Sequence, residues 1–291
     1  MADVPVPRIV RLTERIQELP TLPSVIAHIT RLVEDPETSA GDIQKVLSED
    51  PALAGKVLKL VNSAYYGFSR RISSITHAVV ILGFNIVRYL AISSFAIEMF
   101  RFRNPYFDYR GFWVHSLGCA AASDAVARRL KRPNPSDLFM AGLLHDIGKV
   151  VLAVHLEEEF TRALREAHEK GILLREAETA LLGATHADVG GALLEHWRIP
   201  AHLVAAVRFH HAPAAAGDPA GDAYDSTAIV HVGDALARAL LIGDGGDARA
   251  TAPDPEVLAT LKLAESDLGP LMDDTLTAME KVDDFLELIR E

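Results

Sequence analysis

The stretch Gly142-Leu-Leu-His-Asp-Ile-Gly-Lys-Val-Val-Leu152 places an imidazole beside a carboxylate within an apolar run. Its apolar residues recur at spacings of three and four, which predicts a continuous helix with one buried face. Successive helical residues diverge by about 100°, so His145 and Asp146 can both reach an ion beside the helix. Lys149 follows about one turn later on the same side, where its charge can face a phosphate. A buried His–Asp hydrogen bond without an ion is the alternative interpretation, because a buried polar group needs only a partner.

The composition is that of a well-packed globular protein. Of the 291 residues, 49% are hydrophobic and 24% are charged, and the mean hydropathy is +0.14. These values exclude a disordered chain and provide for a sizeable core. The net charge of −11 disfavours non-specific binding to nucleic acid or to an anionic membrane.

Targeting and membrane signals are weak in this sequence. The longest stretch without Asp, Glu, Lys or Arg covers residues 72–87, which is short for a bilayer span. The N-terminus lacks the apolar run of a signal peptide. The single cysteine, Cys119, excludes an internal disulfide and fits a reducing compartment. We therefore expect a cytoplasmic location without membrane contact.

The segments are patterned as helices almost throughout, and none alternates as a strand would, so we expect an all-α, multi-helix bundle. Residues 101–110 include Asn104-Pro105 and several aromatic residues, which predicts a junction between two helical halves, 1–105 and 106–291. A long helix over 111–131 opens the second half. The Gly-rich run 243–253 predicts a flexible linker, followed by two final helices near 254–264 and 268–290.

Further imidazoles and carboxylates occur on separate predicted helices or helix ends of the second half. In chain order, the candidate ligands are His115, His145, Asp146, His186, His210, His211 and Asp234. Imidazole and carboxylate donors without thiolate suit Fe, Mn, Zn or Ni. Asp146 could bridge two such ions through its two oxygens, and a two-ion site can activate water against a phosphoester. Lys149 would then offset the charge of the phosphate.

The order His…His-Asp…His…His-His…Asp is similar to the ligand order of the HD phosphohydrolase superfamily, in particular of its HD-GYP branch. Four further motifs resemble the HDOD domain, an all-helical bacterial module of signal transduction. They are Leu19-Pro-Thr-Leu-Pro23, Asp50-Pro-Ala-Leu53, Leu60-Val-Asn-Ser-Ala-Tyr65 and Ser73-Ser-Ile-Thr-His-Ala-Val-Val-Ile-Leu-Gly83. This match covers roughly residues 16–213. The resemblance implies that the seven candidates form a two-metal site and that Lys149 is the lysine near the name-giving pair.

Two departures from the catalytic relatives bear on function. Enzymes of the HD-GYP branch carry an acidic Gly-Tyr-Pro motif soon after the paired histidines, but His210-His211 is followed here by Ala-Pro-Ala-Ala-Ala-Gly. Gly111 stands where some of those proteins place a further carboxylate ligand. HDOD domains themselves are usually regarded as non-catalytic and often lack much of the ligand set, which this sequence keeps.

Two hypotheses follow. In the first, the chain is a regulatory HDOD protein whose HD-like half holds divalent metal and binds a nucleotide or other phosphoester. Its output is a regulatory protein partner, without direct contact to nucleic acid. In the second, the chain is an active metal-dependent phosphodiesterase or phosphohydrolase with Asp146 and Lys149 as catalytic residues.

Two smaller features also have alternative interpretations. Tyr65, Tyr66 and Phe68 form either part of the core or a partner-docking face. His231 lies one helical turn before Asp234 and could orient a metal ligand without binding the ion itself.

Overall fold

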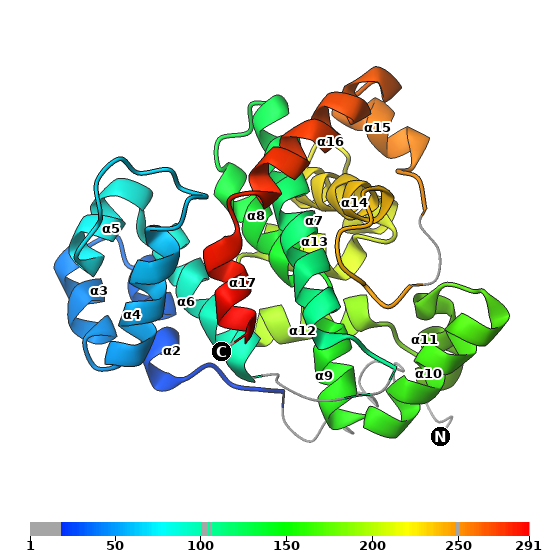
Figure 1. Cartoon of the computed structure of the whole chain (residues 1–291), viewed down its shortest axis with the longest axis horizontal. Helices are drawn as coiled ribbons and strands as arrows, with labels where there is room; N and C mark the ends of the chain where they lie inside the picture. Colours follow the sequence, from blue (N-terminus) through cyan, green and yellow to red (C-terminus); the bar gives the residue numbers. More distant parts are fainter. Residues whose placement is uncertain (1–18, 100–103, 105, 248–250, 291) are drawn as a thin grey trace, which may run out of the picture.

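The computed structural model describes residues 19–99, 104, 106–247 and 251–290 (Figure 1). Within these residues the fold is built from helices, and the only strand-like pairing is an isolated bridge between Asn104 and Phe107. The all-α prediction is therefore confirmed.

The first half contains five described helices, at one side of the molecule in Figure 1. They are α2 (Ser24–Glu34), α3 (Ala40–Leu47), α4 (Pro51–Val61), α5 (Ile75–Leu82) and α6 (Phe84–Met99). The start of α3 is fixed by a capping box, in which Ser39 and Asp42 bond each other's backbone amides. The Asn62 side chain fixes the loop after α4, because it donates to the Ile72 carbonyl at 2.8 Å and accepts from the Ile72 amide at 2.7 Å.

The second half is organised around α7 (Tyr109–Arg129), which packs against α8 and α14. The following helices are α8 (Pro135–Leu144), α9 (Ile147–His155), α10 (Glu157–Lys170), α11 (Leu174–Leu182), α12 (His186–His196), α13 (Ala201–Phe209) and α14 (Asp222–Ala239), with a short 3₁₀ turn at Pro213–Ala216. Helices α8, α13 and α14 all contact one another. This group of neighbours forms the framework of the candidate site.

Three helices, rather than the two predicted, close the chain: α15 (Pro255–Leu261), α16 (Glu265–Met279) and α17 (Asp283–Arg290). The prediction of a single helix over 268–290 was wrong because the chain turns at 280–282. This turn directs α17 back onto α4 and α6 of the first half (Figure 1). Phe285 of α17 is fully buried, and its ring contacts those of Tyr65 and Phe139. The division at 105/106 remains a prediction, since residues 100–103 and 105 lie outside the described residues.

The segment Pro135–His155 is the one stretch of described residues long and apolar enough to cross a membrane. Its most apolar window is 89% buried inside the protein. It also changes direction between α8 and α9. Both properties are those of a core segment packed by protein on all sides.

Candidate metal centre

The pair His145–Asp146 lies between two helices, and the prediction of one continuous helix was wrong. Helix α8 ends at Leu144 and α9 begins at Ile147. His145 keeps a helical backbone, whereas Asp146 has φ −102° and ψ 9°. The break changes the direction of the chain at the two residues that carry the chemistry.

Two glycines beside this break allow neighbouring helices to approach it. A Cβ atom on Gly148 would lie 1.9 Å from the carbonyl oxygen of His186 at the start of α12. A Cβ atom on Gly142 would lie 2.8 Å from the Cα of Ala120 on α7. Both distances are too short for any larger residue, so glycine is required for α7 and α12 to reach the pair.

The structure brings all seven candidate ligands together, in two groups. The first group is Asp146, His186, His210 and His211, and the second is His115, His145 and Asp234. Within each group, one potential ligand atom per residue lies within 4.8 Å of the others. Asp146 Oδ1 lies 3.1 Å from His186 Nε2, whereas its Oδ2 lies 3.2 Å from His145 Nε2. The Asp146 carboxylate therefore stands between the two groups.

Three of the imidazoles are held so that Nε2 faces the cluster. The Nδ1 atoms of His145, His186 and His210 bond the Gly142 carbonyl (2.7 Å), the Glu178 carboxylate (2.7 Å) and the Val207 carbonyl (2.8 Å), respectively. Because these partners accept a hydrogen bond, each Nδ1 carries the proton and leaves the Nε2 lone pair available. Metal-binding histidines are oriented in this way in proteins.

Several atoms of the cluster lack a partner that a cation would supply. His145 Nε2, His210 Nε2 and Asp146 Oδ1 are buried and have no hydrogen-bond partner among the described residues. Each such atom costs about 1–3 kcal/mol when it stays unpaired. Metal bonds of about 2.0–2.2 Å place the ligands of one ion roughly 3 Å apart, which agrees with the separations around Asp146. The cluster thus has the donors and the spacing of a divalent-metal site.

Charge and burial keep three donors, His210, Asp146 and Asp234, in the forms that bind metal. For two other histidines the acidic neighbours outweigh burial: Asp146 raises the pKa of His145, and Glu178 raises that of His186. Burial lowers the pKa of His210 to about 4, so its imidazole is neutral near pH 7. Burial opposes ionisation of Asp146, but His145 and Lys149 nevertheless hold the pKa of its carboxyl well below the usual range. Asp234 is likewise buried, and the adjacent Arg238 guanidinium keeps its pKa well below the usual range. Metal binds neutral imidazoles and ionised carboxylates, so an ion entering the cluster would take the place of the extra proton on His145 and His186.

Lys149 is committed to protein partners instead of facing an open space. Its side chain is fully buried, and Nζ donates to Asp146 Oδ2 at 2.7 Å and to the Gly245 carbonyl at 2.6 Å. Asp247 Oδ2 lies a further 3.4 Å from Nζ. The sequence suggested a lysine directed at phosphate, whereas this ammonium group joins the HD pair to residues 243–247.

Residues 243–247, called the strap below, cross directly over the cluster. The Asp244 amide donates to the Gly111 carbonyl at 2.9 Å, and a Cβ atom on Gly245 would lie 3.1 Å from His115 Nε2. Asp247 accepts from Arg238 at 2.8 Å and from the Leu174 amide at 2.9 Å. The prediction of a flexible linker was therefore wrong for the strap, which is bonded along its length to α7, α9, α11 and α14.

Sequence reasoning missed three residues that support the cluster: Glu178, Arg238 and Asp247. Arg238 could have been predicted from the sequence, because it lies one turn after Asp234 on α14, at the spacing of a helical ion pair. In the structure its Nε donates to Asp234 Oδ1 at 2.8 Å. Glu178 and Asp247 meet the cluster only through the tertiary fold. His231 lies outside the two groups: its Nδ1 donates to the His210 carbonyl at 2.7 Å, which supports that ligand through the backbone.

The cluster is closed to solvent. His145, Asp146, His186 and His210 are 0% exposed, His115 is 1% exposed and Asp234 is 6% exposed. His211 is the half-buried member of the set. Any molecule that reaches the remaining donors must displace part of the protein.

Comparison with known proteins assigns the family. The HDOD domain model matches residues 19–213, about two thirds of the chain. This chain belongs to the HDOD family. An uncharacterised Treponema pallidum (strain Nichols) protein is 30% identical to this HDOD chain over 207 residues, which cover 69% of the chain and 39% of that protein. The chain therefore spans well under half of the length of this relative.

Solved structures show the same fold. A Geobacter sulfurreducens HDOD domain protein of unknown function superposes with a TM-score of 0.71 at 25% identity, covering 97% of this chain and 96% of the other. A Shewanella amazonensis SB2B protein proposed to be a phosphohydrolase superposes with a TM-score of 0.73 at 23% identity, covering 96% and 97%. Both superpositions span nearly the whole chain, so the shared fold extends beyond the residues that the domain model matches.

Proposed function

We propose that this HDOD protein is a regulatory module whose second half holds two divalent ions in a closed centre and whose output is a protein partner. The closure of the site carries this proposal. Six of the seven candidate ligands are buried, and the strap covers them. A phosphohydrolase must admit a phosphoester to its metals, whereas a structural or sensing centre needs only the ions.

The donor set suits iron, manganese, zinc or nickel. Asp146 would bridge the ions, with His186, His210 and His211 on one side and His115, His145 and Asp234 on the other. Glu178 would fix the ring of His186, and Lys149 and Arg238 would hold the two carboxylates in position. When bound, the ions would supply positive charge that joins α7, α12, α13 and α14 to the break between α8 and α9.

Metal occupancy would control how firmly these helices pack. Without ions, the unpaired Nε2 and carboxylate atoms lie together in the core at a cost in stability. Helices α7 and α8 also contact α17 and α6, which belong to the joint between the halves. A change in metal state would therefore change the surface that a partner recognises.

A turnover assay with a matched control separates this proposal from catalysis. The protein is loaded in turn with Fe, Mn, Zn and Ni and assayed with cyclic dinucleotides, nucleotides and generic phosphoesters. Asp146→Ala removes the bridging carboxylate, and Asp273→Ala, at an exposed position, is the control. We expect metal-loaded wild type to show no turnover above that of Asp146→Ala. Turnover that Asp146→Ala abolishes and Asp273→Ala retains would overturn the regulatory proposal.

The second candidate function is a metal-dependent phosphohydrolase or phosphodiesterase. The position of Asp146 between two ligand groups favours it, because a shared carboxylate is the arrangement expected of a two-ion site. Asp146 and Lys149 would be its catalytic residues, and Lys149 would have to release Gly245 to meet a substrate phosphate. Under this alternative, loosening the strap raises turnover, and Asp247→Ala would be more active than wild type.

A further inference from the structure

A groove that shares no residue with the metal cluster runs along the seam between the two halves. One cavity, of about 760 Å³, lies between the loop after α4, α5 and the start of α6 on one side and α7 and α16 on the other. A second, of about 460 Å³, shares Leu82, Ile86 and Ser136 with the first and continues it past the start of α8. We call the two the seam groove. Together they exceed the roughly 300–1,000 Å³ of a small-ligand pocket, which favours a larger occupant.

The aromatic residues after α4 divide between the core and this groove. The loop that carries them extends from the first half toward α8 (Figure 1), where the centroid of the Tyr65 ring lies 4.7 Å from that of Phe139. The Tyr65 hydroxyl is buried without a hydrogen-bond partner among the described residues. Tyr66 and Phe68 are partly buried, and their nearly parallel rings line the groove. These two rings provide the aromatic part of its wall.

Helix α5 carries exposed apolar side chains beside the groove. Ile81 lines it and is 44% exposed, and the neighbouring Val80 is 73% exposed. No other large apolar side chain described in the first half is exposed. Exposed apolar groups that gather on one face are typical of an interaction site.

The same part of the chain has an unusual balance of charge. Residues 51–97 contain no Asp or Glu, although the whole chain has 40, and they include five Lys or Arg. Three of the five are paired with carboxylates or buried, namely Lys56, Lys59 and Arg88. The other two, Arg70 and Arg71, follow Phe68 closely, are exposed and make no ion pair within the described part of the chain.

Across the groove, the carboxylates are mostly neutralised by neighbouring cations. The pairs are Arg128 with Asp124 and Arg129 with Asp267. Lys281, in the turn after α16, and Asp274 make no ion pair among the described residues. The unpaired charges around the larger cavity are thus three cations, Arg70, Arg71 and Lys281, against one carboxylate. A chain with a net charge of −11 is here locally positive.

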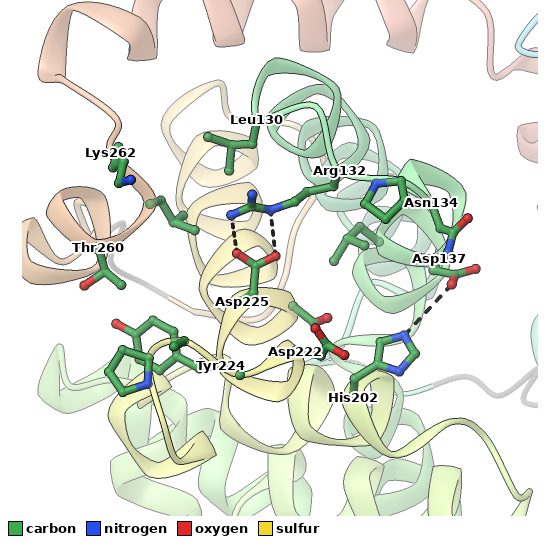
Figure 2. A pocket seen from close by; sticks show the side chains of 17 residues that line it. Leu130, Arg132, Asn134, Asp137, His202, Asp222, Tyr224, Asp225, Thr260 and Lys262 are labelled. Atoms are coloured by element: carbon green, nitrogen blue, oxygen red, sulfur yellow. Dashed lines mark hydrogen bonds and ion pairs between the residues drawn. The ribbon is translucent and has the colours of Figure 1, made fainter.

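The cavity of about 650 Å³ beside the turn after α15 lacks this balance (Figure 2). Its wall holds Asp137, Asp222 and Asp225 against Arg132 and Lys262, and Arg132 is bound to Asp225. Asp137 also lines the smaller cavity of the seam groove, so the positive charge is confined to the larger one.

We propose that the seam groove docks a segment of a partner protein that combines apolar and acidic side chains. The apolar side chains would pack on Tyr66, Phe68 and Ile81, and the carboxylates would meet the unpaired cations. A nucleic acid would need a row of cations along its phosphates, whereas the wall here is mainly aromatic and aliphatic. The inference rests on the proposed function for the existence of a protein partner.

The groove and the metal cluster share one rigid element. Helix α7 carries His115 of the cluster and Arg128 of the groove, about 20 Å apart along its axis. A partner bound at the groove would therefore contact a helix that also holds a candidate metal ligand.

Selection from a library of short random peptides tests the groove. Peptides displayed on phage are selected on the full chain, synthesised and titrated by fluorescence anisotropy. Non-specific attraction to a chain of charge −11 would enrich basic peptides, so an acidic, apolar consensus is a discriminating result. The test variants are Ile81→Asp and the double variant Arg70→Glu with Arg71→Glu, all at exposed positions. Arg162→Glu, at an exposed position of α10, is the control.

We expect the enriched peptides to be acidic and apolar, and to bind both test variants about tenfold or more weakly than they bind wild type or Arg162→Glu. Three outcomes would overturn the inference: no acidic, apolar peptide is enriched, either test variant binds as tightly as wild type, or a single-stranded oligonucleotide displaces the peptide at equal concentration. A dimer that Ile81→Asp dissociates, measured by sedimentation velocity, would also overturn it, because the occupant would then be a second copy of this chain.

Elemental analysis of the same preparations separates this inference from the proposed function. Two ions per chain without peptide binding would contradict the docking site alone. Peptide binding by a chain that holds no ions would contradict the metal centre alone.

Discussion

The two ends of α8, α13 and α14 differ in almost every physical respect. At one end lie His145, His210 and Asp234, buried under the strap and surrounded by charges that are paired inside the protein. At the other end is an open cavity of about 650 Å³ whose lining includes Arg132, Asp137 and Asp225 (Figure 2). The ends are joined directly, since Ser226 and Asp234 lie on one helix about 12 Å apart along its axis.

An enzyme active site must both hold its catalytic groups and admit a substrate. Here the buried ligand cluster and the open cavity lie at different ends of the same helices. One end holds the candidate metal ligands but is closed to solvent. The other end is open to solvent but has no candidate metal ligands. Four predictions, from the largest expected effect to the smallest, test how far the ends differ.

The first prediction concerns Asp146, which both ligand groups share. Asp146→Ala should reduce the metal content of the purified protein to nearly zero, as measured by elemental analysis. It should also lower the free energy of unfolding by roughly 3–5 kcal/mol, because it leaves the buried Lys149 without its closest carboxylate. Asp273→Ala is the exposed control. Full metal content in Asp146→Ala would show that the carboxylate is not a ligand.

The second prediction concerns Glu178, which no sequence pattern indicated. Glu178→Gln keeps the shape of the side chain but removes the charge that orients His186. We expect metal affinity to fall by about 10–100-fold, as is usual when the carboxylate behind a ligating histidine is lost. Competition with a chromophoric chelator measures this change. Unchanged affinity would mean that the ring of His186 needs no such support.

The third prediction concerns the strap. Asp247→Asn weakens charge-assisted contacts to Lys149 and Arg238, each worth about 1.5–3 kcal/mol. The strap should open more often, so that transfer of metal to excess chelator becomes roughly tenfold faster while metal stoichiometry stays the same. The comparison variant is Asp273→Asn. Equal release rates in the two variants would indicate that the strap does not limit access.

Sequence reasoning succeeded for features that are encoded in the spacing and order of residues along the chain. The helical class, the HDOD family and the seven candidate ligands could all be predicted, because they depend on residue spacing and on the order of motifs along the sequence. The apolar residues at spacings of three and four around His145 also predicted the burial of this stretch. Each of these features is local or ordered along the sequence.

The rest depended on contacts that local patterns do not encode. Asp247 lies 98 residues from Lys149, and its Gly-rich surroundings resemble those of a mobile linker. The break after Leu144 follows from tertiary packing, since Gly148 is pressed against the start of α12. The predicted role of Lys149 was wrong for the same reason. Its spacing from His145 did place it beside Asp146, but its other partners, Gly245 and Asp247, come from the strap.

The fourth prediction concerns the open end and has the smallest effect. Burial raises the pKa of Asp137 above its usual range, despite the opposing effect of His202. The unfolded chain therefore ionises this group at lower pH than the folded protein, and folding stability falls as the pH rises through that interval. Asp137→Asn should slightly raise the melting temperature at pH 7, and this gain should disappear below about pH 4. A gain that is independent of pH would point to packing instead of charge.

The metal content of the wild-type protein tests the central claim most directly. The protein is purified without a metal-affinity column, dialysed against a chelator at neutral pH and analysed for Fe, Mn, Zn and Ni. A closed centre predicts two ions per chain, retained through dialysis and released on unfolding. A stoichiometry near zero in preparations grown with each metal would contradict the account and leave the buried histidines and aspartates as a hydrogen-bonded core.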